Sequence, residues 1–153
     1  MNELPELQVM SVKIPVSDLA ASRRWYAEVF GLTEVMEWPD ADGVVRGVAL
    51  SGLGTVLLAL REHGVAAAAT HGFGFLNVRV PAEEDLAGCG THLDRLQIRH
   101  TEVISGASGR LVGFHDLDGH ELSFYAQTTT DGVRDDAVRH VQMAGQHQST
   151  PTP

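Results

Sequence analysis

Residues 7–31 read LQVMSVKIPVSDLAASRRWYAEVFG, and they predict a β-strand followed by a helix. In residues 7–16 the side chains alternate between two faces, one of which carries Val9, Ser11 and Lys13. Ser17 and Asp18 then offer an N-cap, apolar residues recur at helical spacing through residue 30, and Gly31 offers a C-cap. We therefore expect a strand over residues 7–16 and an amphipathic helix over residues 19–30.

The order of elements after this helix indicates an internal duplication. Three strand-like runs follow the helix, over residues 33–38, 44–50 and 55–60. After an expected loop over residues 63–71 the order begins again, with a strand over 72–80, a helix that starts at Pro81, and strands over 100–104, 110–115 and 121–127. The sequence therefore predicts two β-α-β-β-β modules, at about 7–62 and 72–127, which together form a single domain over residues 1–127. Residues 128–153 are expected to be a partly disordered C-terminal extension.

Composition excludes several classes of partner. The chain has 153 residues and a formal net charge of −9, and its basic residues form no stripe, so we expect neither nucleic acid nor a membrane as a partner. Cys89 is the single cysteine, which rules out an internal disulfide and a thiolate metal cluster. The first residues are acidic and lack the basic start of a signal peptide, so we expect a cytoplasmic protein.

Two motifs point to a family. The stretch VSDLAASRRWYAEVFGL over residues 16–32 resembles the first strand-to-helix signature of the vicinal oxygen chelate superfamily, and FHDLDGHELSF over residues 114–124 resembles its terminal hairpin. The superfamily includes glyoxalase I, methylmalonyl-CoA epimerase, extradiol dioxygenases, fosfomycin-resistance transferases and drug-binding bleomycin-resistance proteins. The resemblance implies an α+β fold in which the two modules form a curved open sheet around a central cavity, and it implies a homodimer.

The same resemblance implies that the family's metal site has been lost. Metal-dependent members use His or Glu at four strand positions, two in each module. In this chain those positions fall on Ser11, on Leu58 within one or two residues, on Phe75 and on Ser123. Serine hydroxyls bind first-row metals weakly, and Leu and Phe do not bind them. We therefore expect no metal and no cofactor.

Strand alternation predicts which side chains face the cavity. The candidates for ligand binding are Ser11, Lys13, Leu58, Phe75, Asn77, Arg79, Ser123 and Tyr125. The alternative is that these side chains fill the concave sheet as ordinary core. His120 takes the place of the asparagine in the family's hairpin, where we expect a role in the turn.

The sequence favours binding over catalysis without deciding between them. We expect a metal-independent protein that sequesters a small apolar or aromatic organic molecule. The alternative is a metal-free isomerase, lyase or cyclase that works by general acid–base catalysis, with Lys13, His115, Glu121 and Tyr125 as candidate groups. A metal-dependent lyase or dioxygenase with relocated ligands is a weaker alternative.

Overall fold

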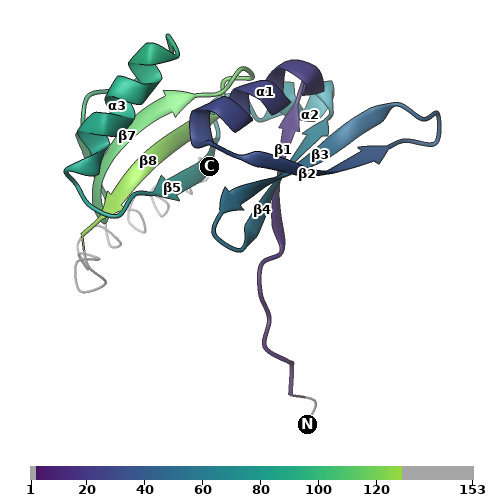
Figure 1. Ribbon diagram of the computed structural model, residues 1–153, viewed down its shortest axis with the longest axis horizontal. Helices are drawn as coiled ribbons and strands as arrows, with labels where there is room; N and C mark the ends of the chain where they lie inside the picture. Colours follow the sequence, from purple (N-terminus) through teal and green to yellow (C-terminus); the bar gives the residue numbers. More distant parts are fainter. Residues whose placement is uncertain (1–2, 129–153) are drawn as a thin grey trace, which may run out of the picture. The chain divides into compact units, whose positions relative to one another are not determined.

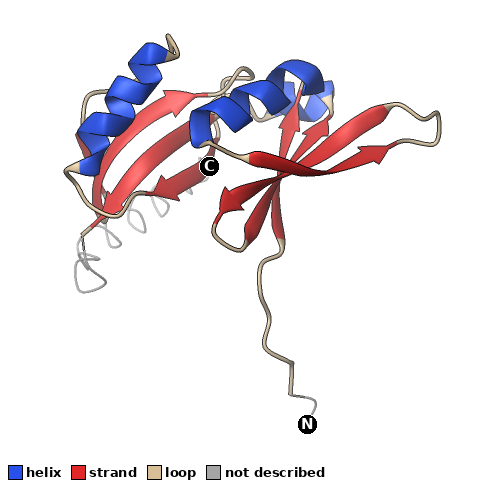
Figure 2. Cartoon of the chain, in the orientation of Figure 1, coloured by secondary structure: helices blue, strands red, loops and turns tan. Residues whose placement is uncertain are grey.

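The fold contains two four-stranded sheets and three helices in the part of the chain that the computed structural model describes, residues 3–128 (Figures 1 and 2). The elements in order are β1 (Ser11–Val16), α1 (Leu19–Phe30), β2 (Thr33–Pro39), β3 (Val45–Leu53), β4 (Val56–Glu62), α2 (Gly64–Ala69), β5 (Gly74–Arg79), α3 (Asp85–Arg95), β6 (Ile104–Gly106), β7 (Gly109–His115) and β8 (Glu121–Gln127). The predicted α+β class and the duplicated strand order are confirmed.

The two sheets have equivalent strand orders, β1-β4-β3-β2 in the first and β5-β8-β7-β6 in the second. In the first sheet β1 runs parallel to β4, whereas β4 and β3, and β3 and β2, are antiparallel. In each sheet the first and last strands of a module are therefore neighbours, and the sheet stays open. This arrangement follows from the repeated β-α-β-β-β order.

Contacts divide the described chain into two compact units that do not coincide with the two modules. Unit 1 comprises residues 3–76 and residues 114–122, and unit 2 comprises residues 77–113 and 123–128. The hairpin at the end of β7 and the start of β8 thus belongs to unit 1, although it comes from the second module. The two units are described separately below.

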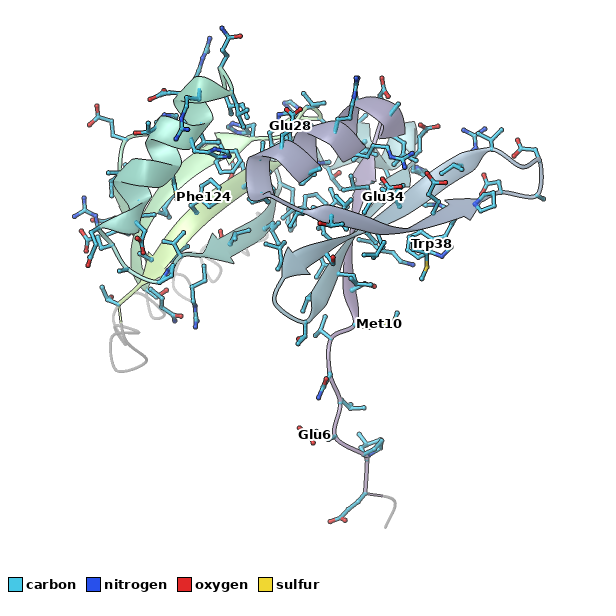
Figure 3. The ribbon with its side chains drawn as sticks, in the orientation of Figure 1. Glu6, Met10, Glu28, Glu34, Trp38 and Phe124 are labelled. Carbon is cyan, nitrogen blue, oxygen red and sulfur yellow. The ribbon has the colours of Figure 1, made fainter. Side chains whose placement is uncertain are left out.

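The helix α1 forms over the residues that the sequence predicts. The Asp18 side chain accepts a hydrogen bond from the Ala21 N–H at 3.0 Å, and Gly31 ends the helix in the left-handed region at φ 65°. The helix packs against β3 and β4 through a buried side that includes Leu19, Tyr26 and Val29. Glu28 lies on the exposed side of the helix (Figure 3).

Strand register places the core of unit 1 between α1 and the first sheet. Ile14 pairs with Leu60, which pairs with Val48, and all three side chains are fully buried. Leu58 and Leu50 form the next buried row. Paired residues point to the same side of a sheet, so these two rows form one continuous apolar face.

Several boundaries differ from the predicted ones, and the second helix begins at Asp85 and not at Pro81. The first strand begins at Ser11 and not at residue 7, because its parallel partner β4 begins at Val56 and leaves residues 3–10 without a partner strand beyond one bond from the Leu57 N–H to the Met10 carbonyl. Met10 is exposed in this segment (Figure 3). The expected loop over residues 63–71 contains α2, which His63 caps through its Nδ1. The strand expected over residues 100–104 is β6, at Ile104–Gly106.

The second predicted helix, α3, forms despite two interior glycines. Leu86 and Leu93 make its buried side. A Cβ added at Gly90 would lie 3.3 Å from the His100 imidazole, so glycine at this position lets the ring pack against the helix. The low helix propensity of Gly90 is therefore the cost of close packing.

The predicted C-terminal extension lies almost wholly outside the described residues, which end at residue 128. Within those residues, each helix is too short or too polar to cross a membrane.

Candidate ligand pocket

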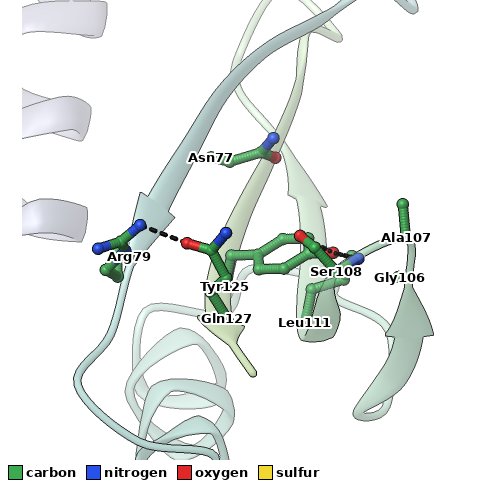
Figure 4. Close-up of a pocket in the computed structure, with 8 residues that line it drawn as sticks. All are labelled: Asn77, Arg79, Gly106, Ala107, Ser108, Leu111, Tyr125 and Gln127. Carbon is green, nitrogen blue, oxygen red and sulfur yellow. Dashed lines mark hydrogen bonds between the residues drawn. The ribbon is translucent and has the colours of Figure 1, made fainter. Parts of the chain in front are cut away.

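A pocket of about 460 Å³ lies in unit 2, at the end of the second sheet (Figure 4). Its lining comes from β5, β7 and β8 and from the turn between β6 and β7: Asn77, Arg79, Gly106, Ala107, Ser108, Leu111, Tyr125 and Gln127. Three of the predicted ligand-binding residues, Asn77, Arg79 and Tyr125, are among them. A volume of this size is within the usual range for small-molecule sites.

A fourth predicted residue, Ser123, fixes one wall of this pocket. Its buried hydroxyl donates a hydrogen bond to the Asn77 Oδ1 at 2.6 Å. Ser123 is on β8 and Asn77 is on β5, so the bond joins neighbouring strands across one face of the sheet. This bond holds the Asn77 amide in one orientation.

Tyr125 is held by the turn between β6 and β7. Its hydroxyl oxygen accepts a hydrogen bond from the Ser108 N–H at 2.9 Å and lies 3.3 Å from the Ser108 Oγ, which also donates to it. The ring packs so closely on Gly106 that a Cβ there would lie 2.9 Å from the Tyr125 Cζ. Gly106 is therefore needed for the position of the phenol.

Arg79 and Gln127 form the charged end of the pocket. The Arg79 guanidinium donates a hydrogen bond to the Gln127 Oε1, as Figure 4 shows. The partner of Arg79 is thus a neutral side chain. Because the partner is neutral, the positive charge of Arg79 is not cancelled by it.

The candidates from the first module lie in unit 1, and the register corrects one of them. Ser11 pairs with Leu57, and Lys13 pairs with Ala59, so these four share a face of the first sheet. Leu58 pairs with Val12 and belongs to the buried face against α1. The prediction that Leu58 lies on the same face as Ser11 and Lys13 is wrong, because the expected register of β4 is displaced by one residue and a shift of one residue reverses the face.

The remaining candidates are also in unit 1. Phe75 is half-buried, and its ring packs edge-on against the His120 imidazole, with centroids 4.5 Å apart. Lys13, His115 and Glu121 are exposed, and none of them lines the pocket. Of the four groups named for acid–base catalysis, Tyr125 alone belongs to the pocket lining.

The residues at the family's metal positions do not fit a metal ion. With the corrected register the position in β4 falls on Leu57 beside Ser11, and the second module offers Phe75 and Ser123. This set has no imidazole, carboxylate or thiolate, which are the groups that bind first-row metals. Among residues 3–128, moreover, the structure contains no group of three or more His, Cys, Asp or Glu that could hold a metal ion.

Sequence reasoning missed a buried polar network in unit 1. The Asp116 Oδ2 accepts hydrogen bonds from the Tyr26 hydroxyl at 2.6 Å and from the His120 Nδ1 at 2.9 Å. Its Oδ1 accepts from the backbone N–H groups of Asp118 and His120, both at 2.9 Å. Burial and the Asp116 charge raise the pKa of Tyr26, so the phenol stays protonated and donates.

His120 therefore does more than complete a turn. Its ring is fully buried, Asp116 fixes the proton on Nδ1, and its Nε2 lies 2.8 Å from the Thr70 Oγ1. The network thus connects α1, the end of α2 and the hairpin between β7 and β8. Each of these bonds joins residues of unit 1, so the network stabilises that unit.

The pocket residues missed by the sequence are those in the turn between β6 and β7, with Leu111 and Gln127. Alternation along a strand identifies faces but does not indicate where a turn folds over a sheet. The run of Gly106, Ser108 and Gly109 was the available signal, since it marks a turn in which backbone comes close to other atoms.

Comparison with known proteins agrees with the fold. Solved structures with the same fold include a glyoxylase/bleomycin resistance protein/dioxygenase domain from Frankia sp. EAN1pec, with a TM-score of 0.64 and 22% identity over 82% of this chain and 100% of that one. The antibiotic binding protein TnmS3 from Streptomyces sp. CB03234 has a TM-score of 0.63 and 19% identity over 82% and 100% of the two chains. Lactoylglutathione lyase from Agrobacterium tumefaciens has a TM-score of 0.62 and 19% identity over 80% and 96%.

Identities this low support the fold alone, and the family is identified by a family model. No curated protein matches the chain significantly. The model of the Glyoxalase/Bleomycin resistance protein/Dioxygenase superfamily matches residues 8–124, which is well over half of the chain. The match includes both the strand-to-helix motif and the terminal hairpin. The chain therefore belongs to the Glyoxalase/Bleomycin resistance protein/Dioxygenase superfamily.

Proposed function

We propose that this protein binds a small organic molecule without a metal ion, and that the pocket in unit 2 contributes to the site. The observation that carries the proposal is the pocket itself, a space of about 460 Å³ with an apolar wall at Leu111 and Ala107 and polar groups on the other sides. Such a combination suits a ligand held by apolar contact and oriented by a few hydrogen bonds.

Two further observations support binding without a metal. The four positions at which metal-dependent relatives carry ligands hold Ser11, Leu57, Phe75 and Ser123 in this chain. In addition, a protein of similar fold, TnmS3, is an antibiotic binding protein. That neighbour's function is consistent with the binding of a small organic molecule that we propose here.

The neutral aromatic dye N-phenyl-1-naphthylamine tests the proposal. We expect saturable binding of one dye per chain in the presence of EDTA, measured by the rise in dye fluorescence. Ala107→Trp places an indole in the pocket lining and is expected to weaken binding about tenfold or more, which corresponds to about 1.4 kcal/mol. Ala87→Trp, at an exposed position on α3, is the matched control and should leave binding unchanged.

Two results would contradict the proposal. The first is dye binding that appears only after Zn²⁺, Mn²⁺ or Fe²⁺ is added. The second is an equal affinity in the Ala107→Trp variant and the wild type, since the dye would then bind elsewhere.

The homodimer implied by the family resemblance is part of the same proposal. Light scattering coupled to size-exclusion chromatography tests it directly, and a mass of one chain at micromolar concentration would refute it. We also keep the cytoplasmic location as a proposal, tested by fractionation of cells that produce the protein.

A further inference from the structure

Two amide oxygens of the pocket, on Asn77 and Gln127, already accept hydrogen bonds from neighbouring side chains. The Asn77 Oδ1 accepts from the Ser123 hydroxyl at 2.6 Å, which leaves the Asn77 NH₂ group as the free end of the amide. The Gln127 Oε1 accepts from Arg79, which leaves the Gln127 NH₂ group as the free end of that amide. Among residues 3–128 neither NH₂ group has an acceptor, whereas each amide oxygen already has a donor, so both amides offer a ligand mainly donors.

Tyr125 follows the same pattern. Its oxygen accepts from the N–H and the Oγ of Ser108, and a phenol oxygen has two lone pairs. Its own proton remains available for donation. The guanidinium of Arg79 has five N–H donors, and the structure records one hydrogen bond from it, to Gln127.

Charge points in the same direction as the donors. Among the residues that the structure describes, Arg79 is the one side chain of the pocket lining with a full charge, and the lining includes no Asp or Glu. The chain as a whole carries a net charge of −9, so a positive pocket is a local exception. A neutral polar ligand would use donors and acceptors alike, whereas an ionised acid offers acceptors alone and carries the opposite charge.

We propose that the ligand of this pocket is an organic acid whose ionised oxygens face Arg79, Asn77 and Tyr125 and whose hydrocarbon part lies against Leu111 and Ala107. The inference rests on the proposed binding function and adds the chemical class of the ligand. A carboxylate, a sulfonate and a phosphonate share the required feature, which is two or more charged oxygen acceptors on a small apolar body.

Two dyes that differ by one anionic group test the inference. 8-Anilinonaphthalene-1-sulfonate carries the anilinonaphthalene skeleton of N-phenyl-1-naphthylamine with an added sulfonate. The readout is the ratio of each dye's Kd in a variant to its Kd in the wild type, so differences in dye hydrophobicity cancel. Arg79→Gln should raise the Kd of the sulfonate dye about tenfold (about 1.4 kcal/mol) and leave that of the neutral dye within about twofold.

Two further variants separate charge from structure. Asn77→Asp keeps the shape of the side chain and replaces its donor group with a charged acceptor, so it should weaken the sulfonate dye at least as much as Arg79→Gln does. Arg95→Gln removes an exposed arginine on α3 that is outside the pocket lining, and it should change neither Kd. Circular dichroism of each variant checks that the fold is retained.

Each outcome decides for or against the inference. Equal weakening of both dyes by Arg79→Gln, or no change in the sulfonate dye, overturns the anionic class and leaves the proposed binding function in place. Weakening by Arg95→Gln as large as that by Arg79→Gln also overturns it, because the effect would then reflect overall charge. If the neutral dye binds the Ala107→Trp variant as tightly as the wild type, that separate result contradicts the proposed function.

Discussion

The Asp116 carboxylate in unit 1 offers the sharpest test of how the fold is held together. It receives four hydrogen bonds, from the Tyr26 hydroxyl, from the His120 ring and from two backbone N–H groups. Tyr26 and His120 are both 0% exposed, so neither can turn to solvent if Asp116 is lost. We therefore expect Asp116→Ala to be among the most destabilising substitutions in the unit.

The size of the effect follows from the groups left without a partner. A buried donor that loses its acceptor costs about 1–3 kcal/mol. Asp116→Ala leaves the Tyr26 hydroxyl and the His120 Nδ1–H in this state, which gives about 4 kcal/mol for the two together. Tyr26→Phe removes a donor and leaves Asp116 with three others, so it should cost about 1.5 kcal/mol.

The double variant separates this explanation from a general loss of packing. In the Asp116→Ala variant the buried Tyr26 hydroxyl has lost this acceptor and destabilises the fold, and Tyr26→Phe removes that destabilising group. The two substitutions should therefore be non-additive, with a coupling free energy of about 1–3 kcal/mol.

Urea denaturation followed by tryptophan fluorescence measures all three variants. Glu28→Ala is the control, because this exposed carboxylate on α1 should contribute less than about 0.5 kcal/mol. A loss below about 1 kcal/mol for Asp116→Ala, or additivity of the two substitutions, would refute the reasoning.

Three further sets of substitutions test separate features of the chain. Gly106→Ala should destabilise the protein by about 1–3 kcal/mol, because the added methyl group would displace the Tyr125 ring. Gly88→Ala in α3 should instead stabilise the protein by about 0.5–1 kcal/mol, because nothing lies within 4 Å of the added methyl group. Asp18→Ala removes the N-cap of α1 and should lower the free energy of unfolding by about 1 kcal/mol, with Asp18→Asn close to the wild type. A backbone hydrogen bond and a nearby carboxylate raise the pKa of His100 above 6.5. Its protonated form therefore stabilises the fold below about pH 6.5, and this contribution is lost as the pH rises through the folded-state pKa. His100→Asn should remove that pH dependence of stability, measured by urea titration at about pH 5.5 and 8.5.

Local sequence signals were sufficient for every element except α2, apart from some boundaries, and for one face of the second sheet. The Asp18 cap and Gly31 mark the ends of α1 without reference to the rest of the fold. Alternation in β5 and β8 correctly placed Asn77 and Ser123 on one face, where the Ser123 hydroxyl donates to the Asn77 amide oxygen.

The errors arose where a partner far along the chain decides the outcome. The face of Leu58 depends on how β4 aligns with β1, and a strand of seven residues with apolar side chains at most positions gives no signal for that choice. His120 was expected in a turn, and its burial depends on Tyr26 and Thr70, which are remote in sequence. The same limit applies to the turn between β6 and β7, whose position over Tyr125 is a tertiary contact.

The hydrogen bond from Tyr26 to Asp116 has a consequence for any attempt to produce the two repeats as separate fragments. Tyr26 and Asp116 are 90 positions apart, in different copies of the repeat, yet they belong to the same compact unit. A fragment that stops near residue 71 would contain the whole first repeat and still lack the carboxylate that its buried tyrosine needs. The two halves should therefore be poor folders when they are made separately, and mixing them should restore the structure by complementation. Duplication has left two copies that are alike in strand order but are no longer self-sufficient.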